Sequence, residues 1–373
     1  MGQAALRNVA PETPAGRPVS ESSTPAAVCR LRPAARSSQI AGLRDLLAAR
    51  FRGHAVAVVA LGVVTAGACL ETHPRLSRPD RPGQGVDMPA AEYHGGPAPL
   101  SRAADAQLIV IPGGRSVAGS TPEERATAYD DYQATAGHDA ARRGKWFERE
   151  EDRHMIALPA FRIDAMPVTN AAYAEMVADG AAPPPTMDEA TWAKQGFQQD
   201  WATEVQRFVW PGDRPPPGRE DHPVVLVTWV QAAAYCVWRG AVVGDKRRLP
   251  TAYEFEKAAR GVDGRAYPWG TLYEPAKLDA ASGGPHDTVA VGTYPEGASV
   301  LGVMDVAGNV FQWTSTRWPP DGPQAGPPTA EMTVKGSAWD DFGGLGRGAA
   351  WHGRPREARH VLVGFRCAAD VRE

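Results

Sequence analysis

The chain has four cysteines, and their spacing limits the thiol chemistry that it could perform. Cys29, Cys69, Cys236 and Cys367 form no C-x-x-C pair and no zinc-type spacing. A disulfide scaffold is therefore excluded as the main source of stability. We expect Cys236 and Cys367 to be two buried free thiols, and the alternative is one bridge between them in an oxidising compartment.

Polar and aromatic side chains that could bind a ligand gather near the C-terminus. The spacing of His352 and His360 fits neither H-x-x-H nor H-x-x-x-H, which disfavours a zinc-type site built on them. Two interpretations remain: a polar ligand groove with tryptophan anchors, or a solvated charged face whose arginines hold loops through backbone carbonyls. The residues concerned are Trp339, Asp340, Asp341, Arg347, Trp351, His352, Arg354, Arg356, Glu357, Arg359 and His360.

Other signatures of catalysis or nucleic-acid binding are absent from the sequence. There is no G-x-S-x-G elbow, no G-x-x-x-x-G-K-[ST] phosphate loop and no H-E-x-x-H helix. The net charge is -3, from 40 basic and 43 acidic residues, without the basic surplus of nucleic-acid-binding proteins. We therefore expect no nucleic-acid partner.

The N-terminal part resembles an export signal. The uncharged apolar run 55–68 follows Arg44, Arg50 and Arg52; it is too short to span a bilayer and suits a signal peptide. Because residues 66–69 resemble a bacterial lipobox, Cys69 is the predicted lipidation site. The prediction is an exported protein that is either secreted or attached to a membrane through a lipid on Cys69, and the alternative is a buried helix in a cytoplasmic protein.

Aromatic residues show where a core can form. All 11 tryptophans lie between Trp146 and Trp351, whereas only Phe51 and Tyr93 are aromatic before residue 108. Large rings dominate core burial. The sequence therefore predicts three parts: a signal-type or disordered segment over 1–69, a Pro/Gly-rich linker over 70–107, and one globular domain over 108–370.

The domain reads as α+β with little regular secondary structure. Apolar β-branched runs predict a strand over 108–114 and short extended pieces over 155–169, whereas the Pro-rich interval 181–220 predicts an irregular region laid over the core. Cap signals predict three helices, which follow Thr169, Thr228 and Thr251 and end at Gly180, Gly240 and Gly261. Ala233, Ala234, Val237 and Trp238 are the expected apolar face of the second helix.

Seven segments, in order along the domain, resemble the sulfatase-modifying-factor (formylglycine-generating enzyme) family. The resemblance implies a C-type-lectin-like fold, low in regular structure and often steadied by calcium. The segments are LIVIPGGRSVAGS, FRIDAMPVTNAAY, HPVVLVTWVQAAAYCVWRG, RRLPTAYEFEKAARG, YPWG, VMDVAGNVFQW and VGFRCA.

The resemblance also implies a copper oxidase whose two cysteines lie shortly after a Gly-Ser motif. Here the matching stretch, 335–360, keeps Ser337 but has Asp340 and Leu345 at the approximate places of the two thiols. Cys236 and Cys367 match structural positions of the family. Because Cu(I) requires soft thiolates, copper is not expected. The stretch lines the family's substrate cleft, so the candidate ligand residues are Ser337, Trp339, Asp340, Arg347, Trp351, His352 and Arg354.

The segment VMDVAGNVFQW resembles a calcium loop of the family. By position, Asp305 and Gln312 would offer side-chain oxygens, and Gly308 and Val310 backbone carbonyls. The family usually has Glu at Gln312, so a lower affinity is expected. The alternative is a tight turn in which Asn309 and Gly308 satisfy local backbone groups. A second family site would involve Asp279 and Asp287.

Two functional hypotheses follow from these observations. The first is a non-catalytic binding or accessory module that takes a peptide, a glycan or a small molecule. The second is an oxidoreductase of the formylglycine-generating enzyme family, or a related metal-dependent modifying enzyme. Metal content and oxidation of a cysteine peptide would separate the two.

Overall fold

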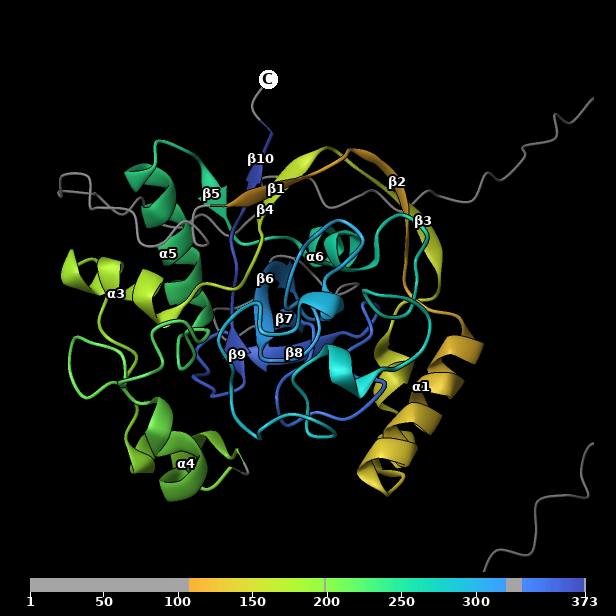
Figure 1. Cartoon of the computed structure of the whole chain (residues 1–373), viewed down its shortest axis with the longest axis horizontal. Helices are drawn as coiled ribbons and strands as arrows, with labels where there is room; N and C mark the ends of the chain where they lie inside the picture. The colour runs from red at the N-terminus through yellow and green to blue at the C-terminus, as the bar shows by residue number, and fades with distance from the viewer. Residues whose placement is uncertain (1–106, 198, 320–330, 372–373) are drawn as a thin grey trace, which may run out of the picture. The chain divides into compact units, whose positions relative to one another are not determined.

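The computed structural model of the chain describes residues 107–197, 199–319 and 331–371 (Figure 1). All of them belong to the unit Pro74–Glu373, one of two into which the chain divides. The apolar run 55–68 and Cys69 lie outside the described residues. Within the described ranges, no helix has the length and apolar character needed to cross a membrane.

Two small antiparallel sheets contain the first four strands of the domain, together with two short strands from later in the chain. The predicted run 108–114 is a strand up to Ile111, where Pro112 and Gly113 interrupt it, and the chain then enters a second strand. The four-stranded sheet has the order β1 (Leu108–Ile111), β4 (Phe161–Asp164), β10 (Ala368–Asp370), β5 (Arg247–Arg248), and the two-stranded sheet pairs β2 (Gly114–Ala118) with β3 (His154–Leu158).

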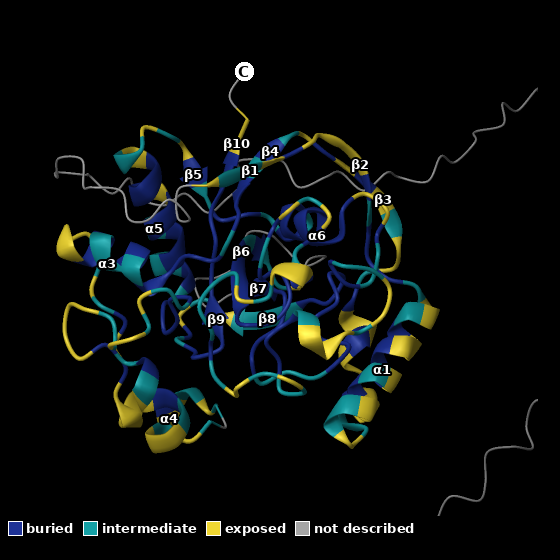
Figure 2. Cartoon of the chain, viewed as in Figure 1, coloured by how far each residue is buried: buried dark blue, intermediate teal, exposed yellow. Residues whose placement is uncertain are grey.

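A third sheet lies at the centre of the domain. Its longest strand, β6, is buried along most of its length and pairs antiparallel with β7 and parallel with β9 (Figure 2). Figure 1 shows α3 and α5 on one side of this sheet and α1 on the other. The order is β8 (His352–Pro355), β7 (Glu331–Lys335), β6 (Phe311–Arg317), β9 (Val363–Gly364).

The three helices predicted from cap signals are present. They are α3 (Asn170–Ala178), α5 (Trp229–Val242) and α6 (Ala252–Arg260), and a threonine side chain caps each of them. The predicted apolar face of α5 is partly wrong, because Val237 is 42% exposed whereas Tyr235 and Cys236 are buried. Those two side chains pack against the aromatic residues beside α5.

The charged stretch after residue 120 contains a helix that the sequence interpretation missed. Thr121 and Glu124 form a capping box, and Gly137 ends the helix with a φ of 74°. The 15-residue helix α1 (Pro122–Ala136) is followed by α2 (Ala140–Arg143) and a 3-10 helix, η2 (Trp146–Arg149). The remaining short helices are α4 (Glu189–Gln195), η3 (Trp201–Val205), η4 (Gln206–Phe208), η5 (Pro275–Lys277) and η6 (Pro295–Gly297).

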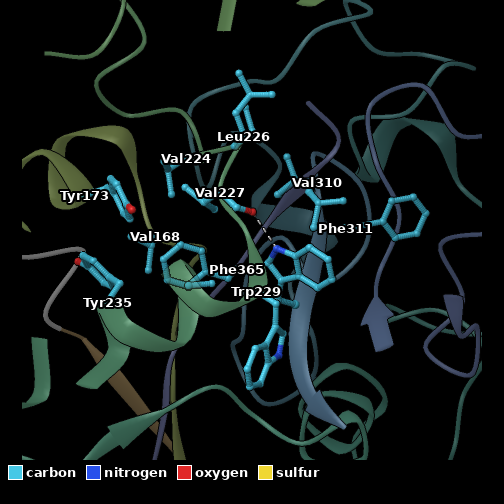
Figure 3. Close-up of a cluster of buried hydrophobic side chains, with 14 of the residues drawn as sticks. Val168, Tyr173, Val224, Leu226, Val227, Trp229, Tyr235, Val310, Phe311 and Phe365 are labelled. Carbon is cyan, nitrogen blue, oxygen red and sulfur yellow. Dashed lines mark hydrogen bonds between the residues drawn. The ribbon is translucent and has the colours of Figure 1, made fainter. Parts of the chain in front are cut away.

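The largest core cluster joins α3 and α5 to the central sheet. Tyr173, Tyr235 and Phe365 pack together, with Tyr173 and Tyr235 stacked at 5.7 Å between ring centroids (Figure 3). Cys236 and Cys367 form a disulfide within the same cluster. The expectation of two free thiols is therefore wrong, because the fold brings α5 against the chain just before β10. The described residues form the predicted α+β fold with short elements.

Candidate ligand-binding site

The predicted ligand segment begins where β7 ends. Gly336 follows the strand with a φ of 78°, a conformation that favours glycine, and turns the chain out of the sheet. The buried Ser337 hydroxyl then accepts a hydrogen bond from the backbone N–H of Gly308 (2.8 Å). The predicted ligand and calcium loops are therefore in direct contact.

Asp340 and Asp341 place two adjacent carboxyl groups against the irregular region. Asp340 Oδ2 accepts a hydrogen bond from Gln199 Nε2 (3.2 Å). Burial raises the pKa of Asp340 to about 6, and the charge of Arg354 opposes this shift. Burial and the charge of Asp340 raise the pKa of Asp341. The pair therefore holds protons closer to neutral pH than surface carboxyl groups do.

Trp339, next to Asp340 in the sequence, packs against aromatic and cationic side chains. Its indole stacks on Phe208, with centroids 6.3 Å apart, and the guanidinium carbon of Arg207 lies 5.4 Å from the indole centroid. Trp339 Nε1, Asp340 Oδ1 and Gln199 Oε1 are buried and have no hydrogen-bond partner among the described residues. A buried polar atom without a partner costs about 1–3 kcal/mol. A polar ligand or an ordered water would relieve that cost.

His352 and Arg354 extend this polar region along β8. Phe311 packs beside both, with its ring centroid 4.9 Å from that of His352 and 5.9 Å from the guanidinium carbon of Arg354. Burial, and then repulsion from Arg354, lowers the pKa of His352 to about 3, so its imidazole is neutral at pH 7. His352 Nε2 and Arg354 Nε lack partners in the described ranges. The charge of Arg354 also acts on Asp340.

Two members of the predicted group are held by partners elsewhere in the domain. Arg347 forms a buried ion pair with Glu150 and donates from Nε to the Gly344 carbonyl (3.0 Å). Trp351 packs edge-on against Tyr253, at 5.6 Å between centroids. The charge of Arg354 therefore acts on both Asp340 and His352, whereas Arg347 acts on His352 but is held by Glu150.

His360 has a structural environment. Its ring packs against Phe197, with centroids 4.1 Å apart, and its Nδ1 accepts a hydrogen bond from the Leu362 N–H (3.1 Å). Burial lowers the pKa of His360 to about 3. Its environment therefore explains a buried neutral imidazole without a metal.

The predicted calcium residues come together around a buried guanidinium. Gln312 Oε1 accepts a hydrogen bond from Arg366 Nε (2.6 Å), and Gln312 Nε2 donates to the Asp305 carbonyl (2.7 Å). The Gly308 carbonyl accepts from the Val310 N–H (2.8 Å). Two of the four oxygens proposed as calcium ligands, Gln312 Oε1 and the Gly308 carbonyl, thus already accept hydrogen bonds within the domain.

The neighbouring turn is held by hydrogen bonds between the Asn309 side chain and the backbone. Asn309 Oδ1 accepts the Val289 N–H (3.2 Å), and Asn309 Nδ2 donates to the Val289 carbonyl (3.1 Å). Asn309 has a φ of 63°, which asparagine tolerates better than most residues. The Asn309 side chain therefore joins this turn to a backbone segment 20 positions earlier in the chain.

The surroundings of Asp279 suit a cation better than those of the predicted calcium loop do. Its side chain is 1% exposed, and neither carboxyl oxygen has a hydrogen-bond partner among the residues described. Burial, together with the charges of Asp287 and Asp305, raises its pKa to about 7. The described ranges contain no group of three or more His, Cys, Asp or Glu side chains suited to a metal ion. A calcium ion at Asp279 would therefore need mainly backbone and water oxygens.

The structure leaves no free thiol among the described residues. Cys236 and Cys367, the two cysteines in these ranges, are joined to each other. Leu345, at the approximate place of one family thiol, packs with Tyr129 and Phe147 in an apolar cluster. The region around Asp340 can therefore offer carboxylate, indole and guanidinium groups, but no sulfur ligand.

Sequence reasoning missed the residues that face Asp340 from the irregular region. They are Gln199, which donates to its carboxylate, Glu204, whose charge raises its pKa, and Arg207, which covers Trp339. The tryptophans of 181–220 indicated that this region covers the core. No periodic pattern indicated which of its polar side chains turn inward.

Comparison with known proteins identifies relatives. Residues 95–371 match the family described as sulfatase-modifying factor enzyme 1-like domain. Hercynine oxygenase from Mycolicibacterium smegmatis is 31% identical over 63% of this chain and 59% of its own length. The formylglycine-generating enzyme of Mycobacterium tuberculosis is 30% identical over 61% of this chain and 93% of its own length. The inactive C-alpha-formylglycine-generating enzyme 2 of Mus musculus is 29% identical over 73% and 88%, respectively.

The chain matches only part of the length of the hercynine oxygenases, and the solved structure is distant in sequence. The chain spans 59% and 47% of the two hercynine oxygenases from Mycolicibacterium species that it matches. Among solved structures, PvdO from Pseudomonas aeruginosa covers 71% of this chain and 94% of its own, at 19% identity and a TM-score of 0.49.

Proposed function

The chain belongs to the family of sulfatase-modifying factor enzyme 1-like domains, and we propose that it is a binding or accessory member without copper-dependent cysteine oxidation. The observation that carries this proposal is the state of the described cysteines, which form a disulfide. Cu(I) needs soft thiolate ligands, which neither the carboxylate of Asp340 nor the aliphatic side chain of Leu345 supplies.

The relatives carry names of different activities, and one of them is named as a formylglycine-generating enzyme. The mouse relative is named as an inactive formylglycine-generating enzyme, and the mycobacterial hercynine oxygenases are named for another activity. The same fold therefore serves members with different chemistry, and function has to be argued from the site.

The proposed ligand site is the polar region of Trp339, Asp340, His352 and Arg354. Its groups are of four kinds: an indole face, a carboxyl group of raised pKa, a guanidinium and a neutral imidazole. Such a set suits a ligand that carries both a flat or apolar part and polar groups. A peptide, a glycan or a small polar molecule has this character.

Export and lipid attachment at Cys69 are part of the same proposal. They rest on the apolar run 55–68 and the lipobox-like residues that precede Cys69. Replacing Cys69 by Ala should move the protein from the membrane fraction to the soluble fraction of expressing bacteria. Membrane retention of the Cys69→Ala variant would contradict lipidation.

The main experiment tests whether the protein oxidises a peptide cysteine to formylglycine, which the proposal says it does not. The purified full chain is loaded with Cu(I), incubated with oxygen and a cysteine-containing sulfatase peptide, and the peptide mass is measured. The formylglycine-generating enzyme of Mycobacterium tuberculosis serves as the positive control. We expect an unchanged cysteine peptide, and formylglycine in the product would refute the proposal.

The likeness to hercynine oxygenases favours one second candidate, a metal-dependent oxidoreductase of the same family. Elemental analysis of the purified chain separates it from the binding module. Stoichiometric iron or copper would favour the enzyme, whereas the binding module should carry neither.

A further inference from the structure

A cavity of about 450 Å³ lies between α1 and the loop that follows α6. One wall is a stripe of α1 formed by Glu123, Thr127 and Asp131, whose spacing of four residues puts them on the same helix face. The opposite wall comes from residues 263–267, including the Tyr267 ring. The volume is typical of small-molecule sites. Neither Trp339 nor Asp340 lines this cavity, so it is separate from the site discussed above.

The arginines that line the cavity already have carboxylate partners. Each of the three forms an ion pair, and Arg153 also donates to the Gly264 carbonyl (2.9 Å). An anionic ligand would therefore have to compete with carboxylates that the protein itself supplies. The pairs are Arg153 with Glu124 (2.5 Å), Arg265 with Asp263 (2.6 Å) and Arg347 with Glu150.

Asp131 differs from the other acidic groups in this cavity. It forms no ion pair with any described residue, and its Oδ2 accepts a hydrogen bond from the Tyr267 hydroxyl (3.0 Å). That hydroxyl also accepts the Gly344 N–H (3.1 Å), so its single proton is committed to Asp131. Burial raises the pKa of the Asp131 carboxyl group, and the hydrogen bond from Tyr267 and the charge of Arg347 oppose this shift. Glu123 adds a second carboxylate at the exposed rim.

We propose that this cavity binds an organic cation whose primary ammonium group docks on Asp131. A carboxylate only accepts hydrogen bonds, and an ammonium group only donates them, so the two form a charge-assisted pair. The methyl groups of Thr127 and Ala266 and the Tyr267 ring give apolar surface for an alkyl chain. A free amine and a lysine side chain of a peptide share this chemistry. The inference is independent of the function proposed above.

Three probes with the same carbon chain test the sign of the charge. The full-length protein is titrated near neutral pH with n-butylammonium, n-butanol or butyrate, and binding is followed by saturation-transfer NMR. We expect binding of n-butylammonium and none of the other two. Nα-acetyl-lysine amide then separates the two sources, because tighter binding than n-butylammonium indicates a peptide lysine and weaker binding indicates a free amine.

Two neighbouring residues of α1 provide the matched variants. Asp131→Asn removes the charge but keeps an oxygen for the Tyr267 hydroxyl, and it should weaken n-butylammonium binding about tenfold or more, as for one charge-assisted hydrogen bond. Asp130→Asn makes the same change at an exposed position that pairs with Arg142 (2.7 Å), and it should leave binding unchanged. Thermal unfolding of both variants checks that the fold is retained.

If Asp131→Asn does not fold, Glu123→Gln at the rim takes its place, with a smaller weakening expected. Stronger binding of butyrate or inorganic phosphate than of n-butylammonium would overturn the proposal. So would the absence of n-butylammonium binding, or equal effects of Asp131→Asn and Asp130→Asn. These outcomes leave the proposed function untouched, because that function is tested separately, by oxidation of a cysteine peptide and by metal content.

Discussion

Removal of the Cys236–Cys367 disulfide should strongly destabilise the domain. The two cysteines are 131 residues apart in the sequence, and cross-linking them restricts the unfolded chain. In the chain-entropy relation, a loop of that length corresponds to about 5 kcal/mol at 25 °C. Natural domains are stable by about 5–15 kcal/mol, so the loss is a large part of the total.

The assay compares Cys236→Ala, Cys367→Ala and the double variant with the oxidised wild type in guanidinium chloride, followed by circular dichroism. Each single substitution removes the whole cross-link, so the double variant should be little less stable than either single variant. Two free thiols would give a different pattern, with small losses that add. Cys69→Ala, which leaves this pair intact, is the control.

Two results would refute this reasoning. One is alkylation of Cys236 and Cys367 in denatured protein that has not been reduced. The other is a set of small, additive losses in the three variants. Either result would return these cysteines to the free-thiol state and reopen the question of a sulfur ligand.

Three further predictions concern buried titratable side chains. Glu256→Gln should cost roughly 3–5 kcal/mol, because Lys335 and Arg260 would keep buried cations without their carboxylate; exposed Glu123→Gln should show no measurable loss in the same denaturant titration. Asp279 has a pKa of about 7 in the folded chain against 3.8 as its ordinary value, so its stabilising contribution is present below pH 3.8 and is lost as pH rises through 7. Asp279→Asn should therefore raise the free energy of unfolding at high pH by a few kcal/mol, at about 1.4 kcal/mol per unit of pKa shift, with little change in acid. Added calcium should give a similar gain in the wild type only. Equal pH profiles of the two proteins would refute this. His360 has a pKa of about 3 against 6.5, so its contribution is lost as pH falls from 6.5 towards 3. His360→Asn keeps an acceptor for the Leu362 N–H and should lose less stability than the wild type over that range, and an unchanged acid profile would count against a buried neutral imidazole.

Local signals in the sequence located three of the six α-helices in the described residues. Thr169, Thr228 and Thr251 each cap a helix where predicted, because a cap depends on residues only three positions away. The capping box of Thr121 and Glu124 carried the same signal for α1. It was missed because that stretch is dominated by charged residues. It buries only a few rings, and its apolar residues form no regular pattern in the sequence.

Contacts between distant segments could not be predicted in the same way. Gln199 reaches Asp340 across 141 positions, and Tyr267 reaches Asp131 across 136. Spacing along the chain does not indicate such proximity, and the same limit explains why Cys236 and Cys367 were expected to be free. The similarity of the 335–360 stretch to its family pointed to Trp339 and Asp340 as candidates, but not to the side chains that surround them.

Copper binding tests the central claim most directly. The chain, with Cys29 and Cys69 replaced by Ser so that only the domain can contribute thiols, is titrated anaerobically with Cu(I). Bound copper is counted by elemental analysis, and its ligands are identified by X-ray absorption. The matched variant adds Asp340→Cys and Leu345→Cys. We predict no sulfur-bound copper in the first protein and sulfur-bound copper in the second. One equivalent of copper held by sulfur in the first protein would contradict the account.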